Sequence, residues 1–269
     1  MALQSGRVAV AALVVAAAGV AFGQGSTVDE IAKYREALQD GNPAELWEAR
    51  GEEMWTAPRG PRKVAFTQCD LGQGPGVVKG AYAHLPRYFK DADRVMDLET
   101  RLLHCMTTLQ GRSREEATQR VFGNADRPSE MESLSAYVAA QSRGMKMAPG
   151  ESHPKEKAAY ELGRALYFQR AGSWDFACTS CHGEEGKRIR LQELPVLLKP
   201  ENARSVAASW PAYRISTSGF VTMQWRMNNC YQQMRMPEPA FGSDTTVALI
   251  HFITVTGKGE TYQGPGNKR

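Results

Sequence analysis

The feature that most constrains this chain is the run Cys178-Thr179-Ser180-Cys181-His182. Two thiols separated by two residues can add to the vinyl groups of haem, and the next residue supplies an imidazole to the iron. The cysteine pair alone would also fit a redox dithiol or half of a zinc site. The adjoining histidine favours a covalently bound haem c, held by Cys178 and Cys181 with His182 as an axial ligand. A helix leading directly into such a motif is typical of small cytochromes.

The first 23 residues are typical of a signal peptide. Arg7 is a short positive region, residues 8–20 are apolar, and Ala21-Phe22-Gly23 offers small residues for cleavage. The apolar run is shorter than the roughly 20 residues that span a membrane, and no later segment is apolar enough to do so. We therefore expect cleavage near Gly23 and export, which in a bacterium means the periplasm, where haem is attached to such motifs.

Charge gives a weak indication of partners. The formal net charge is +4, and it falls to +3 when Arg7 leaves with the signal peptide. This mild basicity is compatible with an acidic protein partner or small anions. The basic residues are dispersed and do not gather on one periodic face, so we expect no nucleic-acid surface.

The number of cysteines is odd, which is informative for an exported protein. Beyond the two haem cysteines the chain contains Cys69, Cys105 and Cys230. In an oxidising compartment, one disulfide plus one special thiol is the simplest arrangement of these three.

Hydrophobic periodicity predicts a mostly α-helical fold in two domains. Glycine and proline between residues 143 and 154 indicate a linker, and residues 72–80 indicate an extended loop. We expect no alternating strands, and a frayed, glycine-rich tail over residues 257–269. The predicted division is a signal peptide at 1–23, an N-terminal domain at 24–145 and a C-terminal haem domain at 146–269. Ordered elements are expected at residues 43–57, 98–109, 133–140, 155–167, 191–198, 221–234 and 245–255.

The second axial ligand of the haem iron decides the chemistry, and the spacing leaves several candidates. Met236-Pro237 resembles the methionine loop of electron-transfer cytochromes, where a thioether gives a high potential. Cys230, as a thiolate, would lower the potential, which suits a simple electron carrier poorly. His251 is a third candidate, although its apolar surroundings are more typical of a packed histidine.

The residues around Cys230 favour a reactive site. Arg226 precedes Cys230 by one helical turn and Arg235 follows it by five residues. Guanidinium groups beside a thiol lower its pKa and can hold a sulfur oxyanion through two hydrogen bonds. Alternatively, these arginines form a solvated helix face.

Beyond these motifs, the chain resembles the SoxA family, the larger cytochrome subunits of SoxAX complexes in bacterial thiosulfate oxidation. The resemblance runs through nearly the whole sequence after the signal peptide, and only the haem motif is common to all c-type cytochromes. The residues that carry it are Asp40-Gly41-Asn42-Pro43-Ala44-Glu45-Leu46-Trp47, Gly80-Ala81-Tyr82, Leu85-Pro86-Arg87-Tyr88, Asp97-Leu98-Glu99-Thr100-Arg101-Leu102, Trp174-Asp175-Phe176-Ala177 with the haem motif and Gly183, and Arg226-Met227-Asn228-Asn229-Cys230.

The resemblance implies two cytochrome c-like domains and an L-cysteine S-thiosulfotransferase activity. It implies that His182 and Cys230 ligate the haem iron, that Cys230 carries an extra sulfur as a persulfide, and that Arg226 lies in the active site. Thiosulfate would be joined oxidatively to a cysteine of the carrier SoxYZ, with two electrons released. One haem accepts one electron, so a small SoxX-type cytochrome partner is expected.

The chain departs from the two-haem members of this family. Cys69 is followed by Asp70-Leu71-Gly72, with no second cysteine or histidine to complete a haem motif. The chain therefore resembles the single-haem branch, which implies a haem-less N-terminal domain and a Cys69–Cys105 disulfide. Closing a loop of about 36 residues would stabilise this domain by roughly 3–4 kcal/mol. His104 is interpreted as a surface or packed histidine.

Two other functional classes compete with the thiosulfotransferase. The chain could be a non-catalytic periplasmic electron-transfer cytochrome with His182 and Met236 as ligands, or a haem protein that mainly forms a scaffold for its partner. A methionine ligand gives a weak long-wavelength absorption band and a high potential, whereas a thiolate gives a strongly negative couple, so a spectrum separates the first alternative.

Overall fold

A computed structural model describes residues 33, 37, 41–124, 126–189 and 192–268. The described residues from 41 onward lie in one compact unit. The predicted signal peptide lies outside the described residues. The division of the remainder into domains at 24–145 and 146–269 stays a prediction. None of the helices in the described part is long and apolar enough to cross a membrane.

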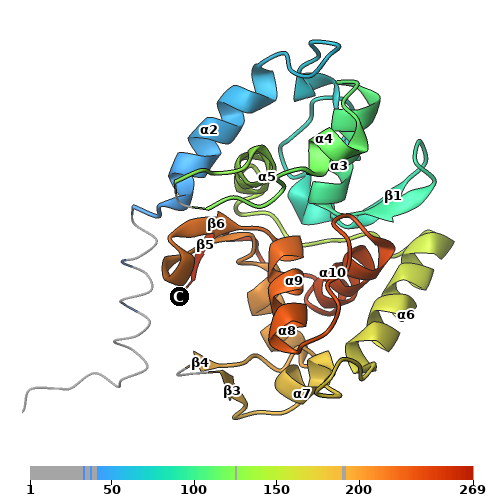
Figure 1. The fold of residues 1–269 in the computed structure, drawn as a ribbon, viewed down its shortest axis with the longest axis vertical. Coiled ribbons are helices and arrows are strands. Elements are labelled where there is room, and N and C mark those ends of the chain that lie inside the picture. Colours follow the sequence, from blue (N-terminus) through green and yellow to red (C-terminus); the bar gives the residue numbers. More distant parts are fainter. Residues whose placement is uncertain (1–32, 34–36, 38–40, 125, 190–191, 269) are drawn as a thin grey trace, which may run out of the picture. The chain divides into compact units, whose positions relative to one another are not determined.

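The fold is mostly helical, as predicted, and its strands are short (Figure 1). The strands are β1 (Arg87–Phe89), β2 (Arg94–Met96), β3 (Arg188–Ile189), β4 (Gln192–Glu193), β5 (Ala212–Arg214), β6 (Gly219–Val221) and β7 (Gly266–Lys268). The helices are α2 (Ala44–Thr56), α3 (Leu98–Thr108), α4 (Arg114–Thr118), α5 (Glu130–Ala140), α6 (Pro154–Phe168), α7 (Cys178–His182), α8 (Pro200–Ala207), α9 (Met223–Gln233) and α10 (Asp244–Thr256), with single turns η1 (Phe66–Gln68), η2 (Tyr82–His84) and η3 (Ile215–Thr217).

The helices begin where capping residues stand, which is not always where apolar periodicity predicts a start. Helix α5 begins at Glu130, three residues before the predicted start, because Ser129 and Glu132 form a capping box. Helix α6 begins at Pro154, whose fixed φ suits a first helical position. Helix α8 was not predicted. The segment 192–198 instead contains the short strand β4, which pairs with β3, and turns, because Pro195 in its middle has no amide to continue a helix.

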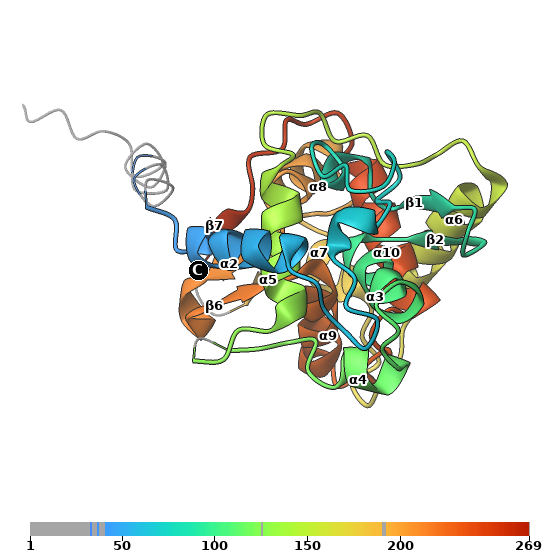
Figure 2. The same cartoon turned by 90° about the horizontal axis from the view of Figure 1, so that it is seen from above.

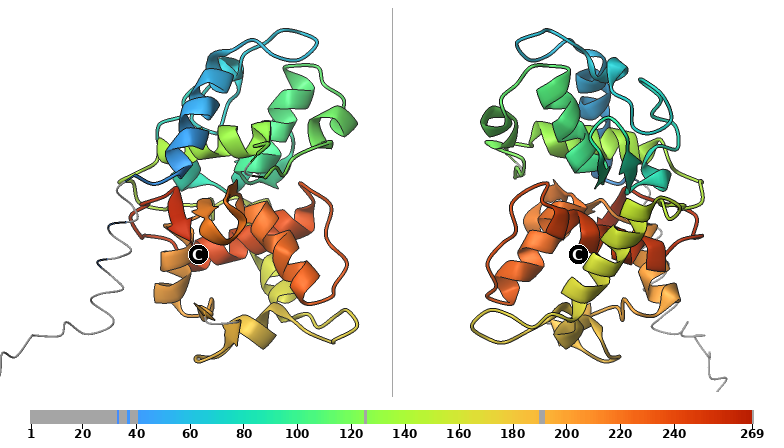
Figure 3. Two further views of the ribbon diagram at one scale, coloured as in Figure 1. Left: turned by 60° about the vertical axis from the view of Figure 1, so that its left-hand side comes forward. Right: turned by 90° about the vertical axis from the view of Figure 1, so that its right-hand side faces the viewer.

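Two helix crossings form the framework of the fold, and they are built alike. Helix α2 crosses α5, as Figure 2 shows from above, and α6 crosses α10, which lie beside each other in Figure 3. Each crossing needs a glycine, because a Cβ on Gly51 would lie 2.0 Å from the Ser133 carbonyl oxygen, and one on Gly163 would lie 2.0 Å from the Ala248 oxygen.

The aromatic residues of the two crossings also correspond. Four residues after each glycine, an aromatic ring meets a ring of the crossing helix. The centroids of Trp55 and Tyr137 are 6.1 Å apart, and those of Tyr167 and Phe252 are 5.3 Å apart. The first ring pair borders a core made of residues from α2 to α5, and the second borders a core made of residues from α6 to α10.

We expected no alternating strands, but short paired strands form. Strand β5 pairs with β6 in antiparallel fashion and with β7 in parallel. The expected frayed tail is also wrong up to Lys268, because this tail supplies β7 and buries Tyr262 completely. An aromatic side chain within a polar, glycine-rich segment can fix the whole segment when a cavity in the core accepts it.

Candidate active site

The haem motif forms the short helix α7, at the end of a loop that follows α6 (Figure 1). Ala171 and Phe176 close this loop through two backbone hydrogen bonds of 2.9 and 3.1 Å. Cys178 and Cys181 are both free thiols and half-buried, and the Cys178 side chain packs against the core of α6 and α10. The loop also leaves Trp174 52% exposed, so apolar surface is available beside the motif.

The backbone around His182 is held in place by its neighbours. The Tyr167 hydroxyl donates to the His182 carbonyl oxygen over 2.8 Å, and the Leu197 amide donates to it over 3.2 Å. The ring Nδ1 lies 2.8 Å from the Pro195 carbonyl oxygen. A metal-binding histidine usually uses its second nitrogen in this way, which leaves Nε2 for the iron. Burial lowers the pKa of His182, which favours the neutral imidazole that binds metals.

Cys230 lies on α9, whose Met227 and Tyr231 pack in the same core cluster as the Cys178 side chain. The Cys230 thiol is within electrostatic range of both cysteines of the motif. Burial, followed by the nearby Cys230 thiol, raises the pKa of Cys178 to about 12, and the same two causes raise the pKa of Cys181. A third cysteine, distant in the sequence, therefore lies near the two cysteines of the haem motif.

Arg226 lies on the same face of α9 as Cys230, one turn earlier. Its Nη1 donates to Asn229 Oδ1 over 2.9 Å, which steadies the guanidinium. The positive charge of Arg226 contributes to the lowered pKa of His182, so Arg226 also lies within electrostatic range of that ring. Arg235 does not join this group in the same way, because its guanidinium lies over the Trp174 ring, 5.5 Å from the centroid.

The other two axial candidates are placed differently. Met236 is half-buried against the core of α6 and α10, next to the loop that precedes the haem motif. His251 is completely buried in α10, and its Nε2 lies 3.1 Å from the Glu156 carbonyl oxygen. His251 is thus a packed core histidine, as its apolar surroundings suggested.

The residues at this site fit a c-type haem. Two free thiols and an anchored imidazole provide the attachment and ligation chemistry, and apolar side chains surround them. A zinc site needs about four ligands. Across the described ranges, no group of three or more histidine, cysteine or acidic residues is arranged to hold a metal ion.

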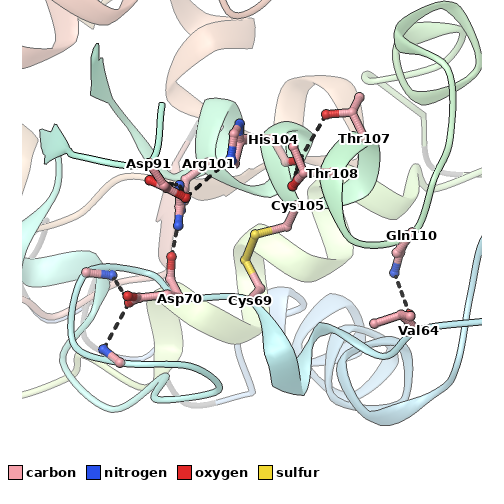
Figure 4. Close-up of a disulfide and its surroundings, with 12 residues drawn as sticks. Val64, Cys69, Asp70, Asp91, Arg101, His104, Cys105, Thr107, Thr108 and Gln110 are labelled. Atoms are coloured by element: carbon pink, nitrogen blue, oxygen red, sulfur yellow. Dashed lines mark hydrogen bonds and ion pairs between the residues drawn. A yellow bond between two sulfur atoms is a disulfide. The ribbon is translucent and has the colours of Figure 1, made fainter. Parts of the chain in front are cut away.

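Cys69 and Cys105 form the disulfide that the resemblance implied, with a Cα–Cα distance of 5.8 Å (Figure 4). His104 points away from this bond toward Asp91, and its Nε2 lies 3.4 Å from a carboxylate oxygen. Arg101 donates to the same carboxylate over 2.7 and 2.9 Å. His104 therefore belongs to a surface ion cluster, in agreement with the sequence interpretation.

The disulfide occupies the position that corresponds to the haem cysteines of the second crossing. Cys69 follows Gly51 by 18 residues and Cys181 follows Gly163 by 18, so Asp70 corresponds to His182. Cys105 and Cys230 are each the eighth residue of their helices, α3 and α9. The two halves thus place cysteines at matching positions, and only the second half has the histidine.

Sequence reasoning did not identify the residues that support the site. Tyr167 and Pro195 hold His182, but a tyrosine in an amphipathic helix and a proline in a loop carry no distinctive pattern. A helical wheel of α6 could have indicated that Tyr167 faces the motif, because it lies one turn after Gly163 on the buried face.

Taken together, the fold and the site define a c-type cytochrome with a cysteine beside its haem-binding motif. A family model described as the SoxA/TsdA cytochrome c domain matches residues 50–147. The SoxA subunit of an L-cysteine S-thiosulfotransferase from Hydrogenophilus thermoluteolus is 48% identical over 239 residues, covering 89% of this chain and 87% of that protein. A SoxA subunit from Hydrogenobacter thermophilus is 36% identical over 247 residues, covering 90% of each chain. The chain belongs to the SoxA family of L-cysteine S-thiosulfotransferase subunits.

A solved structure shows the same fold. The crystal structure of SoxXA from P. pantotrophus matches with a TM-score of 0.71 and 25% identity, covering 88% of this chain and 84% of that one. The family model described as a cytochrome c domain covers the half of the chain that lacks the haem motif.

Proposed function

We propose that this chain is the catalytic subunit of an L-cysteine S-thiosulfotransferase, which joins thiosulfate to a cysteine of a carrier protein. The family relatives carry this name. In the reaction a bond forms between the outer sulfur of thiosulfate and the carrier cysteine sulfur. The thiol proton and two electrons leave, so the step is an oxidation.

One covalently bound haem c would be held by Cys178 and Cys181, with His182 and Cys230 as ligands to its iron. When bound, such a haem supplies an acceptor for one electron at a time. The anchored Nδ1 of His182 fixes the ring in a single orientation and tautomer. The two-electron reaction therefore needs a second acceptor outside this chain.

The observation that carries the proposal is that α9 packs against Cys178 and brings Cys230 within electrostatic range of both cysteines of the motif. We infer that thiosulfate is held at the Cys230 sulfur, which carries a persulfide, while the two electrons released when thiosulfate is joined to the carrier cysteine leave to the haem of this chain and that of its cytochrome partner. Arg226, one turn away and steadied by Asn229, would hold the sulfonate oxygens through two parallel hydrogen bonds. A simple electron carrier needs neither a cysteine nor an arginine at this place.

The partners follow from the reaction. The matched crystal structure contains a SoxX chain with its SoxA chain, and we propose a SoxX-type cytochrome as the second electron acceptor here. The carrier would be SoxYZ, and the mildly basic charge of this chain is compatible with an acidic partner. Together with the predicted signal peptide, these assignments lead us to propose that the protein works in the periplasm.

We also propose that the N-terminal half binds no haem. Asp70 stands where the corresponding half has His182, and Cys69 is joined to Cys105. A disulfide between these positions leaves no thiol for a haem vinyl group. The helices of this half would then stabilise the fold and hold no cofactor.

The decisive experiment replaces Cys230 by alanine in the holoprotein, assayed with its cytochrome partner and the carrier. We expect thiosulfotransferase activity to fall at least about a hundredfold, because the reacting sulfur is lost. Intact mass should still show one haem, and the absorption spectrum should report a changed iron ligand.

The matched control is Met236→Leu, which removes a thioether and keeps the volume. Its activity and haem spectrum should stay within about twofold of the parent. If Met236→Leu changes the spectrum while Cys230→Ala leaves both spectrum and activity intact, the chain is an electron-transfer cytochrome and the proposal is wrong.

A further inference from the structure

The start of α9, the helix that carries Cys230, is hydrogen-bonded to the start of α3. The Gln224 amide nitrogen donates to Glu99 Oε1 over 3.1 Å. The Gln224 side-chain Nε2 donates to both carboxylate oxygens of Asp97 over 3.0 and 2.8 Å, and to Thr100 Oγ1 over 3.0 Å. Asp97 is also the N-cap of α3. The two helices thus share one set of capping groups.

The same glutamine reaches the loop that follows α9. The Gly242 amide donates to Gln224 Oε1 over 2.8 Å, so both polar atoms of the side chain are used. Arg94 donates to the Gly242 carbonyl oxygen over 3.1 Å, and Arg114 donates to the Phe241 carbonyl oxygen over 3.2 Å. Arg94 in β2 and Arg114 in α4 therefore hold the loop that follows α9, while Asp97 and Glu99 hold the start of this helix.

This cluster is buried, although it contains two acidic residues. The exposed fractions of Asp97, Glu99 and Gln224 are 3%, 4% and 1%. A cavity of about 20 Å³ lies beside the two carboxyl groups. Buried carboxyl groups contribute less to stability than apolar residues of the same volume would, and they require defined partners. Such a cluster selects one register of two helices against all others.

We propose that Gln224 is a positioning residue. Through its hydrogen bonds to Asp97 and Glu99 it fixes the position of α9, and with it the positions of Cys230 and Arg226. This inference rests on the proposed role of Cys230. Gln224 precedes Arg226 by two residues and Cys230 by six, so a rigid helix separates them by roughly 3 and 9 Å along its axis. A shift at the start of α9 therefore moves both Arg226 and Cys230. The haem-less half of the chain therefore contributes to the site through α3.

The test uses the holoprotein with its cytochrome partner and compares Gln224→Leu with the parent. The substitution keeps the volume and removes the side-chain hydrogen bonds. We expect kcat to fall about tenfold or more, because small displacements of reacting groups have large effects on rate. The KM for thiosulfate should change less. Amide hydrogen exchange over residues 223–233 should accelerate selectively, and the haem spectrum should become heterogeneous.

A second pair of variants separates positioning from stability. Glu99→Gln keeps an oxygen acceptor for the Gln224 amide and should retain kcat within about twofold at neutral pH, whereas Glu99→Ala should lose about tenfold. Glu132→Ala removes another buried carboxyl group, which caps α5 and makes no contact with α9 among its hydrogen bonds. Gln110→Leu is the corresponding control for the glutamine.

The two controls should lower the melting temperature without changing kcat, the haem spectrum or exchange in α9. The proposal fails if Gln224→Leu and Gln110→Leu lower stability alike while both keep the parental kcat, spectrum and α9 exchange. A failure of Cys230→Ala to abolish activity would instead refute the proposed function, while the exchange and spectral effects of Gln224→Leu would still test the positioning of α9.

Discussion

Glu99 is a carboxyl group that its surroundings keep protonated. Burial, followed by the neighbouring Asp97 charge, raises its pKa to about 8. Thr222 and the Gln224 amide reduce this shift through hydrogen bonds but do not abolish it. Burial raises the pKa of Tyr82, which lines the same cavity, and also the pKa of Asp97, although hydrogen bonds from Thr100 and Gln224 and the charge of Arg94 oppose the shift of Asp97. The extra proton of this pair therefore resides on Glu99.

This raised pKa predicts how stability depends on pH. A group that holds its proton more tightly in the folded state contributes stability at low pH, and the contribution is lost as the pH rises toward the folded-state pKa. The parent should lose stability relative to Glu99→Gln between about pH 5 and 8, by at most roughly 1.4 kcal/mol per pH unit. Urea unfolding of both proteins at pH 5.5 and 8.5 measures this difference, and a difference independent of pH would contradict it.

Single residues differ in how far the sequence reveals them. The haem motif and Arg226 with Cys230 are local patterns, because their spacing within one helix or loop specifies the chemistry. Gln224 and Asp97 are 127 residues apart, and nothing in either neighbourhood indicates that they meet. Their pairing is a consequence of tertiary structure alone.

At the scale of elements, two helix crossings share the same glycine and aromatic positions but lead to different cysteine chemistry. The crossing of α6 and α10 leads to a motif with two thiols and an imidazole, whereas the crossing of α2 and α5 leads to a disulfide. The elements themselves were largely predictable from apolar periodicity. Their ends were less so, because caps such as Ser129 with Glu132 decide where a helix starts.

The disulfide should be important for the stability of α3 and its surroundings. Replacing both Cys69 and Cys105 by alanine opens a loop of 36 residues, and the free energy of unfolding should fall by roughly 3–4 kcal/mol. Urea denaturation of the haem-loaded protein measures this loss. The haem absorption should be unchanged in the folded protein, because the attachment cysteines lie on α7. A loss below about 1 kcal/mol would show that the loop is constrained by other contacts.

At the scale of the molecule, the C-terminal tail joins residues that are distant in sequence. Tyr262 is completely buried against Tyr82, with ring centroids 5.1 Å apart. The Asn42 side chain donates to the Pro265 carbonyl oxygen over 2.9 Å, and β7 completes the three-stranded sheet. This segment therefore closes the fold, although its composition resembles that of a loose end.

None of the described residues hydrogen-bonds the buried Tyr262 hydroxyl, which gives a paired prediction. Tyr262→Phe removes the unsatisfied hydroxyl and keeps the ring, so stability should stay the same or rise. Tyr262→Ala leaves a cavity and should cost about 3–5 kcal/mol. Thermal unfolding of the two variants checks both expectations. Equal destabilisation by the two changes would mean that the hydroxyl, and not the ring, holds the tail.

The sequence by itself determined the cofactor class, the helical composition and the family, because each depends on residues that are close together or on patterns that repeat along the chain. Only the tertiary structure decided that Tyr167 and Pro195 hold His182, that α3 and α9 share their caps, and that the tail is fixed. These features depend on contacts between segments separated by tens to hundreds of residues, where burial and hydrogen bonding select one arrangement and the local sequence does not specify the partner.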